Sequence, residues 1–361
     1  MLRTFRDDAD LGTIGISLLT LVPGVVGGSE THVRNLCRAL ARVGELEYRV
    51  FVPAIAADAA DGLPAKVVRR YPASFEMRGR VRAMAGGLLR GGPLRRELEL
   101  ESLDAIHFPM SVMIPLVSSP PAATTILDVQ HEFLPENFPR SELAYRRYLY
   151  GASARRSRIV IAISEHARET LIERLSLEPE RVRTIHLGVD LDVFSPPEGA
   201  REPFLLYPAS PWPHKNHARL LEAFTLVRRE RPELRLVLTG SGHGVLPDGV
   251  ESVGYVTQDE LASLYRRASA LVFPSLYEGF GQPPLEAMAC GCPVACSDLP
   301  PLREVCGDAA VYFDPEDPEA IAAAALEAVT RGGAAGPARA ARFTWDETAR
   351  KHDDVYRELT G

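Results

Sequence analysis

The sequence is poor in lysine and has no cysteine framework. Only three of its 361 residues are lysine, so arginine supplies nearly all of the 41 positively charged side chains. Four of the five cysteines crowd between Cys290 and Cys306, but their spacing matches neither paired C-x2-C units nor a C-x2-C and H-x3-H zinc pattern. We therefore expect small, reduced, buried side chains near a turn, and a cytoplasmic location.

Long apolar runs are missing as well. No stretch approaches the roughly 18 uninterrupted apolar residues that a membrane span needs. Segment 11–28 comes nearest to such a run. Acidic residues (Asp7, Asp8 and Asp10) precede it and no A-x-A cleavage site follows it, which disfavours a signal peptide. We interpret this segment as a first buried strand and its glycine loop.

A broad excess of positive charge is also absent. The formal net charge is −7, and residues 196–361 hold 16 Lys and Arg against 24 Asp and Glu, whereas residues 1–195 hold 25 against 24. A nucleic-acid binder is usually basic overall, so this balance argues against a nucleic-acid partner. The hydrophobic fraction of 46% is ordinary for a folded protein, and a length of 361 residues predicts two domains.

Short apolar segments alternate with helical patterns along the whole chain. This alternation predicts parallel β-α-β units with helices on both faces of a sheet. Ser195-Pro-Pro-Glu-Gly199 interrupts the alternation, because its prolines and glycine suit neither a helix nor a central strand. We place a hinge there, between domains of residues 1–197 and 198–345. The expected strands are 13–21, 48–52, 105–108, 124–127 and 159–163 in the first domain, and 204–208, 234–239, 252–256, 270–273, 293–297 and 310–313 in the second.

The segment with the most candidate ligand-binding residues follows the expected strand 270–273 and leads into a helix. It reads Glu278-Gly-Phe-Gly-Gln-Pro-Pro-Leu-Glu286. Gly279 and Gly281 let the backbone approach a ligand, and free N–H groups at a helix start attract an anion such as a diphosphate. Glu286 lies in the first turn, where a carboxylate can accept hydrogen bonds from vicinal hydroxyls such as those of a ribose. Two glutamates bracketing such a loop favour a binding site over a plain helix cap.

These residues resemble the E-x7-E signature of the retaining, GT-B-fold glycosyltransferase family 4, with Glu278 and Glu286 as its glutamates. The similarity continues in Gly254-Tyr-Val256, Asp314-Pro-x-Asp-Pro318 and Gly188-Val-Asp190, and it covers nearly the whole chain. It implies an α/β fold of two Rossmann-like, doubly wound parallel-sheet domains that face each other across a cleft. The first would bind the acceptor and the second the donor, and a closing helix, 346–361, would return to the first domain.

The resemblance also implies an activity, that of a retaining hexosyltransferase which moves a sugar from a nucleoside-diphosphate donor to an acceptor hydroxyl. In the front-face reaction expected of this family, the leaving phosphate itself helps to deprotonate the acceptor. Two segments, Pro-His-Lys-Asn and Asp-Val-Gln-His, are similar to those of mannosyltransferases, so GDP-mannose is the expected donor. No cofactor and no metal ion are expected, because Asp8-Ala-Asp10 and Asp190-Leu-Asp192 lie away from strands that would line a sugar-nucleotide site.

Individual site residues follow from the family positions that they match. Gly27 and Gly28 form a glycine turn that would face the donor phosphates. His131 matches a histidine that contacts the donor sugar, and Lys215 a lysine that contacts the diphosphate. The expected catalytic residues are Glu278, His131 and Lys215, and the expected donor-binding residues are Gly27, Gly28, Ser210, His214, Lys215, Gly240, Val256, Glu278, Gly279, Phe280, Gly281, Gln282 and Glu286.

One phosphate contact of the family is missing. Ala209 and Ser210 stand where the family has an arginine. A protonated His214 would supply part of the missing charge; alternatively, His214 only begins a helix. Two other functions therefore stay open, a catalytically silent nucleotide-sugar-binding protein and a GT-B phosphorylase or nucleotide-sugar epimerase.

A strongly basic segment lies in the first half of the chain. Residues 66–96 carry nine Lys and Arg against one acid, Glu76, and residues 140–158 carry six arginines against Glu142. Apolar side chains such as Leu89 interleave with these charges. The combination suits a glycan or lipid-linked acceptor with a phosphate, or peripheral contact with an anionic membrane at its inner face, and a solvated helical face is the alternative.

Overall fold

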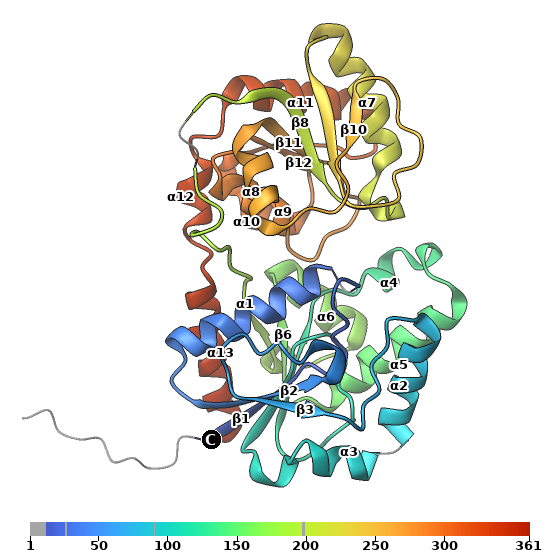
Figure 1. The fold of residues 1–361 in the computed structure, drawn as a ribbon, viewed down its shortest axis with the longest axis vertical. Coiled ribbons are helices and arrows are strands. Elements are labelled where there is room, and N and C mark those ends of the chain that lie inside the picture. The colour runs from blue at the N-terminus through green and yellow to red at the C-terminus, as the bar shows by residue number, and fades with distance from the viewer. Residues whose placement is uncertain (1–11, 26, 90, 197–198) are drawn as a thin grey trace, which may run out of the picture.

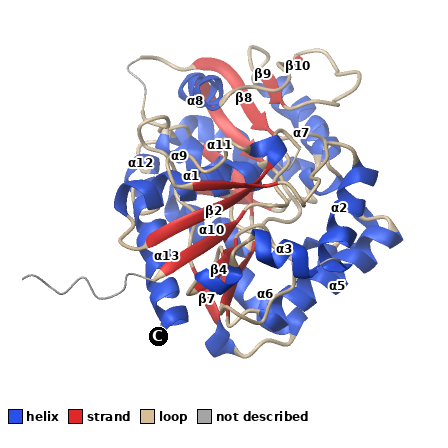
Figure 2. Cartoon of the chain, turned by 60° about the horizontal axis from the view of Figure 1, so that its bottom comes forward, coloured by secondary structure: helices blue, strands red, loops and turns tan. Residues whose placement is uncertain are grey.

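The computed structural model describes residues 12–25, 27–89, 91–196 and 199–361 (Figure 1). The predicted domain boundary at 197 and 198, the Asp8-Ala-Asp10 pattern and Arg90 of the basic segment lie outside the described residues. Within the described ranges, two separate parallel sheets are present, of seven and six strands (Figure 2).

The first sheet has the strand order β3-β2-β1-β4-β5-β6-β7, and every pair in it is parallel. Because β1 lies inside the sheet and the chain winds outward from it in both directions, helices cover both faces. The strands are β1 Thr13–Ser17, β2 Glu47–Pro53, β3 Ala65–Val68, β4 Ala105–Phe108, β5 Ala122–Ile126, β6 Ile159–Ala162 and β7 Val182–Thr184. The helices are α1 Gly28–Val43, α2 Met77–Leu89, α3 Gly91–Glu97, α4 Gln130–Phe133, α5 Arg140–Arg156 and α6 Glu165–Leu175.

The second sheet repeats this winding with the order β10-β9-β8-β11-β12-β13. Its strands are β8 Glu202–Pro208, β9 Arg235–Thr239, β10 Val250–Ser252, β11 Ala268–Phe273, β12 Val294–Ser297 and β13 Ala310–Phe313. Its helices are α7 His217–Glu230, α8 Gln258–Arg267, α9 Gln282–Ala289, α10 Pro300–Cys306, α11 Pro318–Arg331 and α12 Gly336–Ala340. The prediction of two doubly wound parallel sheets is thus confirmed.

The central strands form the core of each domain. All residues of β4, β6 and β12 are buried, as expected for strands covered by helices on both faces. All five cysteines are buried and unpaired, which confirms that they pack as small apolar side chains. Among the residues that the structure describes, no helix has both the length and the apolar character that a bilayer crossing demands.

The last helix, α13 Trp345–Thr360, leaves the second domain and packs against α1 and β4 of the first (Figure 1). Buried polar contacts fix it there. The Tyr356 hydroxyl lies 2.8 Å from His107 Nδ1, and the carboxylate of Asp353 accepts a hydrogen bond from the Glu45 backbone N–H at 2.8 Å. The second half of the chain is therefore tied to the first at a point remote from the chain segment around Ser195.

Candidate active site

Most of the predicted donor-binding residues lie in loops that follow neighbouring strands of the second sheet. Lys215 follows β8, Gly240 follows β9 and Glu278 follows β11. Gly240 contacts the loops that follow β8 and β10. Its N–H donates to the carbonyl of Gly254, after β10, at 2.7 Å, and a Cβ added to it would lie 2.6 Å from the Oγ of Ser210, after β8. With a φ of +92°, this position also requires glycine's backbone freedom.

Lys215 and Glu278, two of the predicted catalytic residues, form an ion pair. Lys215 Nζ lies 2.5 Å from Glu278 Oε1, and the two side chains are only 19% and 13% exposed. The Leu276 N–H, which donates to the His214 carbonyl at 2.8 Å, joins the loops that carry the pair. The remaining N–H bonds of the ammonium and the free lone pairs of the carboxylate can bind a ligand.

Glu286 is buried in α9, just after the first turn rather than within it as expected, because the helix begins at Gln282. The Tyr265 hydroxyl donates to Glu286 Oε2 at 3.3 Å. Burial raises the pKa of Glu286 to about 7, while hydrogen bonds from Gln282 and Tyr265 act in the opposite direction. Tyr265 was not predicted as a site residue; it lies in α8, 21 residues before Glu286, and only the fold brings the two side chains together.

The start of α9 has the predicted geometry for a tight ligand loop. Gly281 is its N-cap residue, with a φ of +122°, and prolines follow in the first turn. A Cβ added to Gly281 would lie 2.6 Å from a methyl group of Leu302, so the loop packs tightly against α10. Phe280 is buried against His186 and Phe343.

His131 is completely buried within the first domain. Its ring packs edge-on against Tyr150, with centroids 4.9 Å apart, and Nε2 lies 3.7 Å from Glu132 Oε1. Burial lowers the pKa of His131 to about 4, so the ring is neutral at neutral pH. His131 can reach a donor sugar only if the side chains around it move.

Asp128, in the same sequence segment as His131, lies beside the ion pair instead. A Cβ added to Gly279 would lie 3.3 Å from Asp128 Cβ. Burial raises the pKa of Asp128, the charge of Glu278 raises it further, and the charges of Arg146 and Lys215 lower it. The Asp-Val-Gln-His motif was recognised in the sequence, but only the structure shows that Asp128, and not His131, lies against the loop of the second domain.

The predicted phosphate contacts differ in accessibility. Gly27 and Gly28 are exposed at the start of α1, and a Cβ added to either glycine meets no atom within 4 Å among the described residues. Open space therefore surrounds this turn. His214 is different: burial and the adjacent Lys215 ammonium lower its pKa to about 4. Without a bound ligand, His214 is therefore neutral at neutral pH, and its role as a substitute for the missing arginine stays a prediction.

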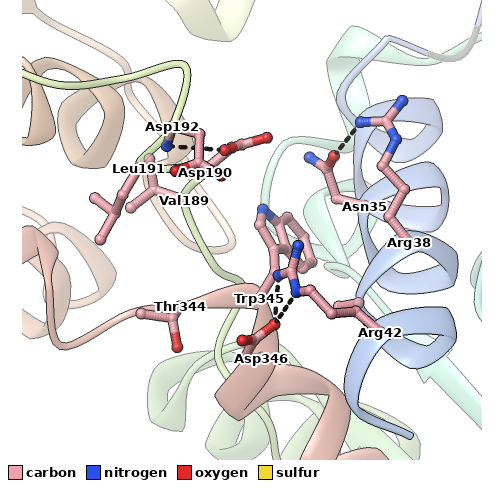
Figure 3. A pocket seen from close by; sticks show the side chains of 11 residues that line it. Asn35, Arg38, Arg42, Val189, Asp190, Leu191, Asp192, Thr344, Trp345 and Asp346 are labelled. Atoms are coloured by element: carbon pink, nitrogen blue, oxygen red, sulfur yellow. Dashed lines mark hydrogen bonds and ion pairs between the residues drawn. The ribbon is translucent and has the colours of Figure 1, made fainter.

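A pocket of about 330 Å³ has none of the predicted donor-binding residues in its lining (Figure 3). It is enclosed by α1, the chain around Asp190 and the start of α13. Asp190 Oδ1 accepts a hydrogen bond from the Asp192 backbone N–H at 3.1 Å, so this D-x-D pattern forms a turn. In the part of the chain that is described, no group of three or more His, Cys, Asp or Glu residues could hold a metal ion.

Two family models match the chain, one in each half. "Glycosyltransferase Family 4" matches residues 26–193, and "Glycosyl transferases group 1" matches residues 190–351. Escherichia coli O-antigen chain mannosyltransferase B is 31% identical over 66% of this chain and 70% of its own length. The O-antigen chain mannosyltransferase RfbU of Salmonella typhimurium is 30% identical over 54% of this chain, which spans only 56% of that relative.

Solved structures agree on the fold. Sucrose-phosphate synthase of Thermosynechococcus elongatus superimposes with a TM-score of 0.73 at 20% identity, over 96% of this chain and 99% of that one. HepE of Anabaena in complex with UDP and glucose gives a TM-score of 0.72 at 16% identity, over 96% and 100%. The predicted GT-B fold is confirmed by these likenesses.

Proposed function

Because this chain belongs to the group 1 glycosyltransferases of family 4, we propose that it transfers mannose from GDP-mannose to an acceptor hydroxyl with retention of the anomeric configuration. Membership of the family makes it a glycosyltransferase. The names of the mannosyltransferase relatives support mannose as the sugar, and their O-antigen products support a glycan acceptor.

The observation that carries this proposal is the ion pair between Lys215 and Glu278. A donor diphosphate would draw the ammonium of Lys215 toward its own charge, because charge-assisted hydrogen bonds to phosphate are strong. Glu278 would then be free to accept hydrogen bonds from the hydroxyl groups of the sugar. One pair of side chains would thus bind the leaving group and orient the sugar that leaves it.

The other residues of the site would complete the donor pocket. Glu286 would accept hydrogen bonds from the ribose, and the first N–H groups of α9 would face the diphosphate. Backbone around Val256 would meet the base. Catalysis would rest on stabilising the diphosphate charge and on holding the reacting atoms in line, with the leaving phosphate accepting the proton of the acceptor.

Thermal denaturation with a set of nucleotide sugars tests the donor. GDP-mannose should raise the melting temperature more than UDP-glucose, UDP-galactose or UDP-N-acetylglucosamine, since a ligand that binds only the folded state stabilises it. Lys215→Ala should remove most of this shift, whereas the exposed control Glu319→Ala should keep it. A larger shift with a UDP-sugar would reject mannose, and no shift with any donor would reject the donor site.

We further propose that the basic segment binds an anionic surface, such as that of a membrane that holds a lipid-linked acceptor. The helices α2, α3 and α5 lie side by side at one edge of the first domain (Figures 1 and 2). Exposed apolar side chains occur here together with exposed arginines, and Leu89 is 86% exposed. The exposed residues that support this proposal are Phe75, Arg78, Val81, Arg82, Leu89, Arg95, Arg96 and Tyr148.

A further inference from the structure

The loop that carries Glu278 makes direct contact with the first domain. Ser164 donates its hydroxyl proton to the Gly279 carbonyl oxygen at 2.7 Å. Gly279 fits there only because it has no side chain: an added Cβ would lie 2.5 Å from the Leu127 carbonyl oxygen, a distance that a real Cβ does not reach. The two domains therefore touch at the residue next to a proposed catalytic group.

A second contact reaches the same region of the first domain. The carboxylate of Glu304, in α10, accepts hydrogen bonds from the backbone N–H groups of Glu165 at 2.8 Å and of His166 at 3.4 Å. These are first-turn donors of α6, which the helix itself leaves unpaired and which carry the positive end of its dipole. His186 Nε2, also in the first half of the chain, lies 2.5 Å from Glu304 Oε1.

The charge of Glu304 suits this contact. Burial raises the pKa of its carboxyl group, but the hydrogen bonds from His186 and from the Glu165 backbone outweigh burial and hold that pKa below its usual value. The carboxylate is therefore ionised at neutral pH. Its main chain is held independently, since Arg339 donates to the Glu304 carbonyl, and also to the Val305 carbonyl at 2.8 Å, within the second domain.

The hydroxyl group of Ser164 makes two hydrogen bonds, one within the first domain and one to the second domain. Its Oγ accepts the Ala167 N–H at 2.9 Å, which caps α6 within the first domain, and its proton is donated across to Gly279. The cap can persist whatever the position of the second domain, whereas the bond to Gly279 exists only while the domains are together. The same holds for the bonds of Glu304 to α6.

We propose that Ser164 and Glu304 are positioning residues that couple closure of the two domains to the placement of Glu278. This inference rests on the proposed function, in which Glu278 holds the donor sugar. In the closed protein the Gly279 carbonyl is fixed, and with it the direction of the adjacent carboxylate toward Lys215. When the domains part, the loop loses this anchor, so the sugar site is complete only after closure.

Glu304→Ala and Ser164→Ala test the proposal, with small-angle X-ray scattering as the first readout. Without any substrate, both variants should have a larger radius of gyration than the wild type. Glu319→Ala is the control for loss of a glutamate in the second domain. Asp317→Ala, which removes the cap of α11 but no contact across the domains, is the control for loss of a helix cap. Ser164→Thr keeps both the cap and the hydroxyl donor and should restore the wild-type value.

Kinetics provide the second readout. Ser164→Ala should lose roughly tenfold in kcat/KM, the effect of one lost buried hydrogen bond, and Glu304→Ala, which removes three bonds to the first domain, should lose at least as much. Their affinity for free GDP should change much less than kcat/KM, because the proposed contacts of Lys215, Glu286 and the start of α9 with GDP lie within the second domain. In a Glu278→Gln background, Ser164→Ala should cause no further loss, since it acts through Glu278.

The outcomes separate this inference from the proposed function. Wild-type scattering and wild-type kcat/KM in both variants would overturn the coupling, as would equal losses in the presence and absence of the Glu278 carboxylate. If the wild-type protein transfers no sugar from any donor, the proposed function is rejected. Scattering from the variants then still decides whether Ser164 and Glu304 hold the domains together.

Discussion

Burial moves several side chains around the proposed donor site toward their neutral forms. The pKa of Glu286 rises to about 7, that of His214 falls to about 4, and that of Asp128 rises. Lys215 is the cation that the structure holds at the proposed diphosphate position, paired with Glu278. On the proposed function, the site would bind its anionic ligand through the positive charge of Lys215 and through the N–H groups at the start of α9.

Replacing Glu286 by alanine should mainly weaken donor binding. The ribose hydroxyls lose their shared acceptor, and hydrogen bonds to a charged group contribute about 1.5–3 kcal/mol. Titration calorimetry with GDP-mannose measures this loss, with Glu319→Ala as a control of equal charge change. Unchanged affinity in the Glu286 variant would remove this residue from the site.

The raised pKa of Glu286 predicts opposite pH dependences for stability and for binding. Because its pKa is above the usual 4.5 in the folded protein, the folded state keeps a proton that the unfolded state has lost between about pH 4.5 and about pH 7. The free energy of unfolding should therefore fall as the pH rises through this window, and donor affinity should rise as the carboxylate ionises. Glu286→Gln should flatten both dependences; a variant with wild-type slopes would assign them to other groups.

The residues of the proposed donor site in the second domain could be predicted from the sequence, whereas the contacts of their loops with the first domain could not. Glu278 and Lys215 were predicted from their motifs, and the structure brings them together. Ser164 and Glu304 were missed, because their bonds join positions 115 and 139 residues away and depend on how the domains meet. Asp128 and His131 share one motif, and only the packing of the first domain decides which of them is enclosed.

At the level of elements, the turn at Asp190 and Asp192 predicts that sugar transfer does not need a metal ion. Asp190 and Asp192 form a turn that one hydrogen bond closes, and on the proposed function Lys215 together with the start of α9 would neutralise the diphosphate. Sugar transfer should therefore continue in EDTA at its original rate. Loss of activity in EDTA that Mg²⁺ or Mn²⁺ restores would show that donor binding uses a metal ion after all.

The α2 helix predicts binding to anionic membranes. In liposome flotation, the bound fraction should rise with the content of anionic lipid and fall with salt, because salt screens exposed charges. Replacing Arg78 and Arg82 by serine should reduce binding without changing donor affinity. The matched control replaces Arg229 and Arg350, two exposed arginines on α7 and α13, by serine. Equal flotation of both double variants would leave the segment as an ordinary solvated surface.

Across the whole molecule, burial decides which strands the sequence could predict. The central strands, such as β4 and β6, are buried on both faces and therefore appear as short apolar runs. The edge strands β3 and β7 were missed, because they have only four and three residues and include Lys66 and Arg183. The strand expected at 252–256 is instead Val250–Ser252, and the residues after it form the loop toward the proposed base.

Nuclear magnetic resonance of the complete reaction tests the central claim most directly. The protein is incubated in EDTA with the nucleotide sugar that stabilises it most, GDP-mannose on this account, with and without a mannoside acceptor. The account predicts that GDP is released only when acceptor is present, and that the anomeric signal of the new product shows the α configuration of the donor. A β product, release of mannose 1-phosphate, a sugar epimerised on an intact nucleotide, or binding without turnover would each contradict it.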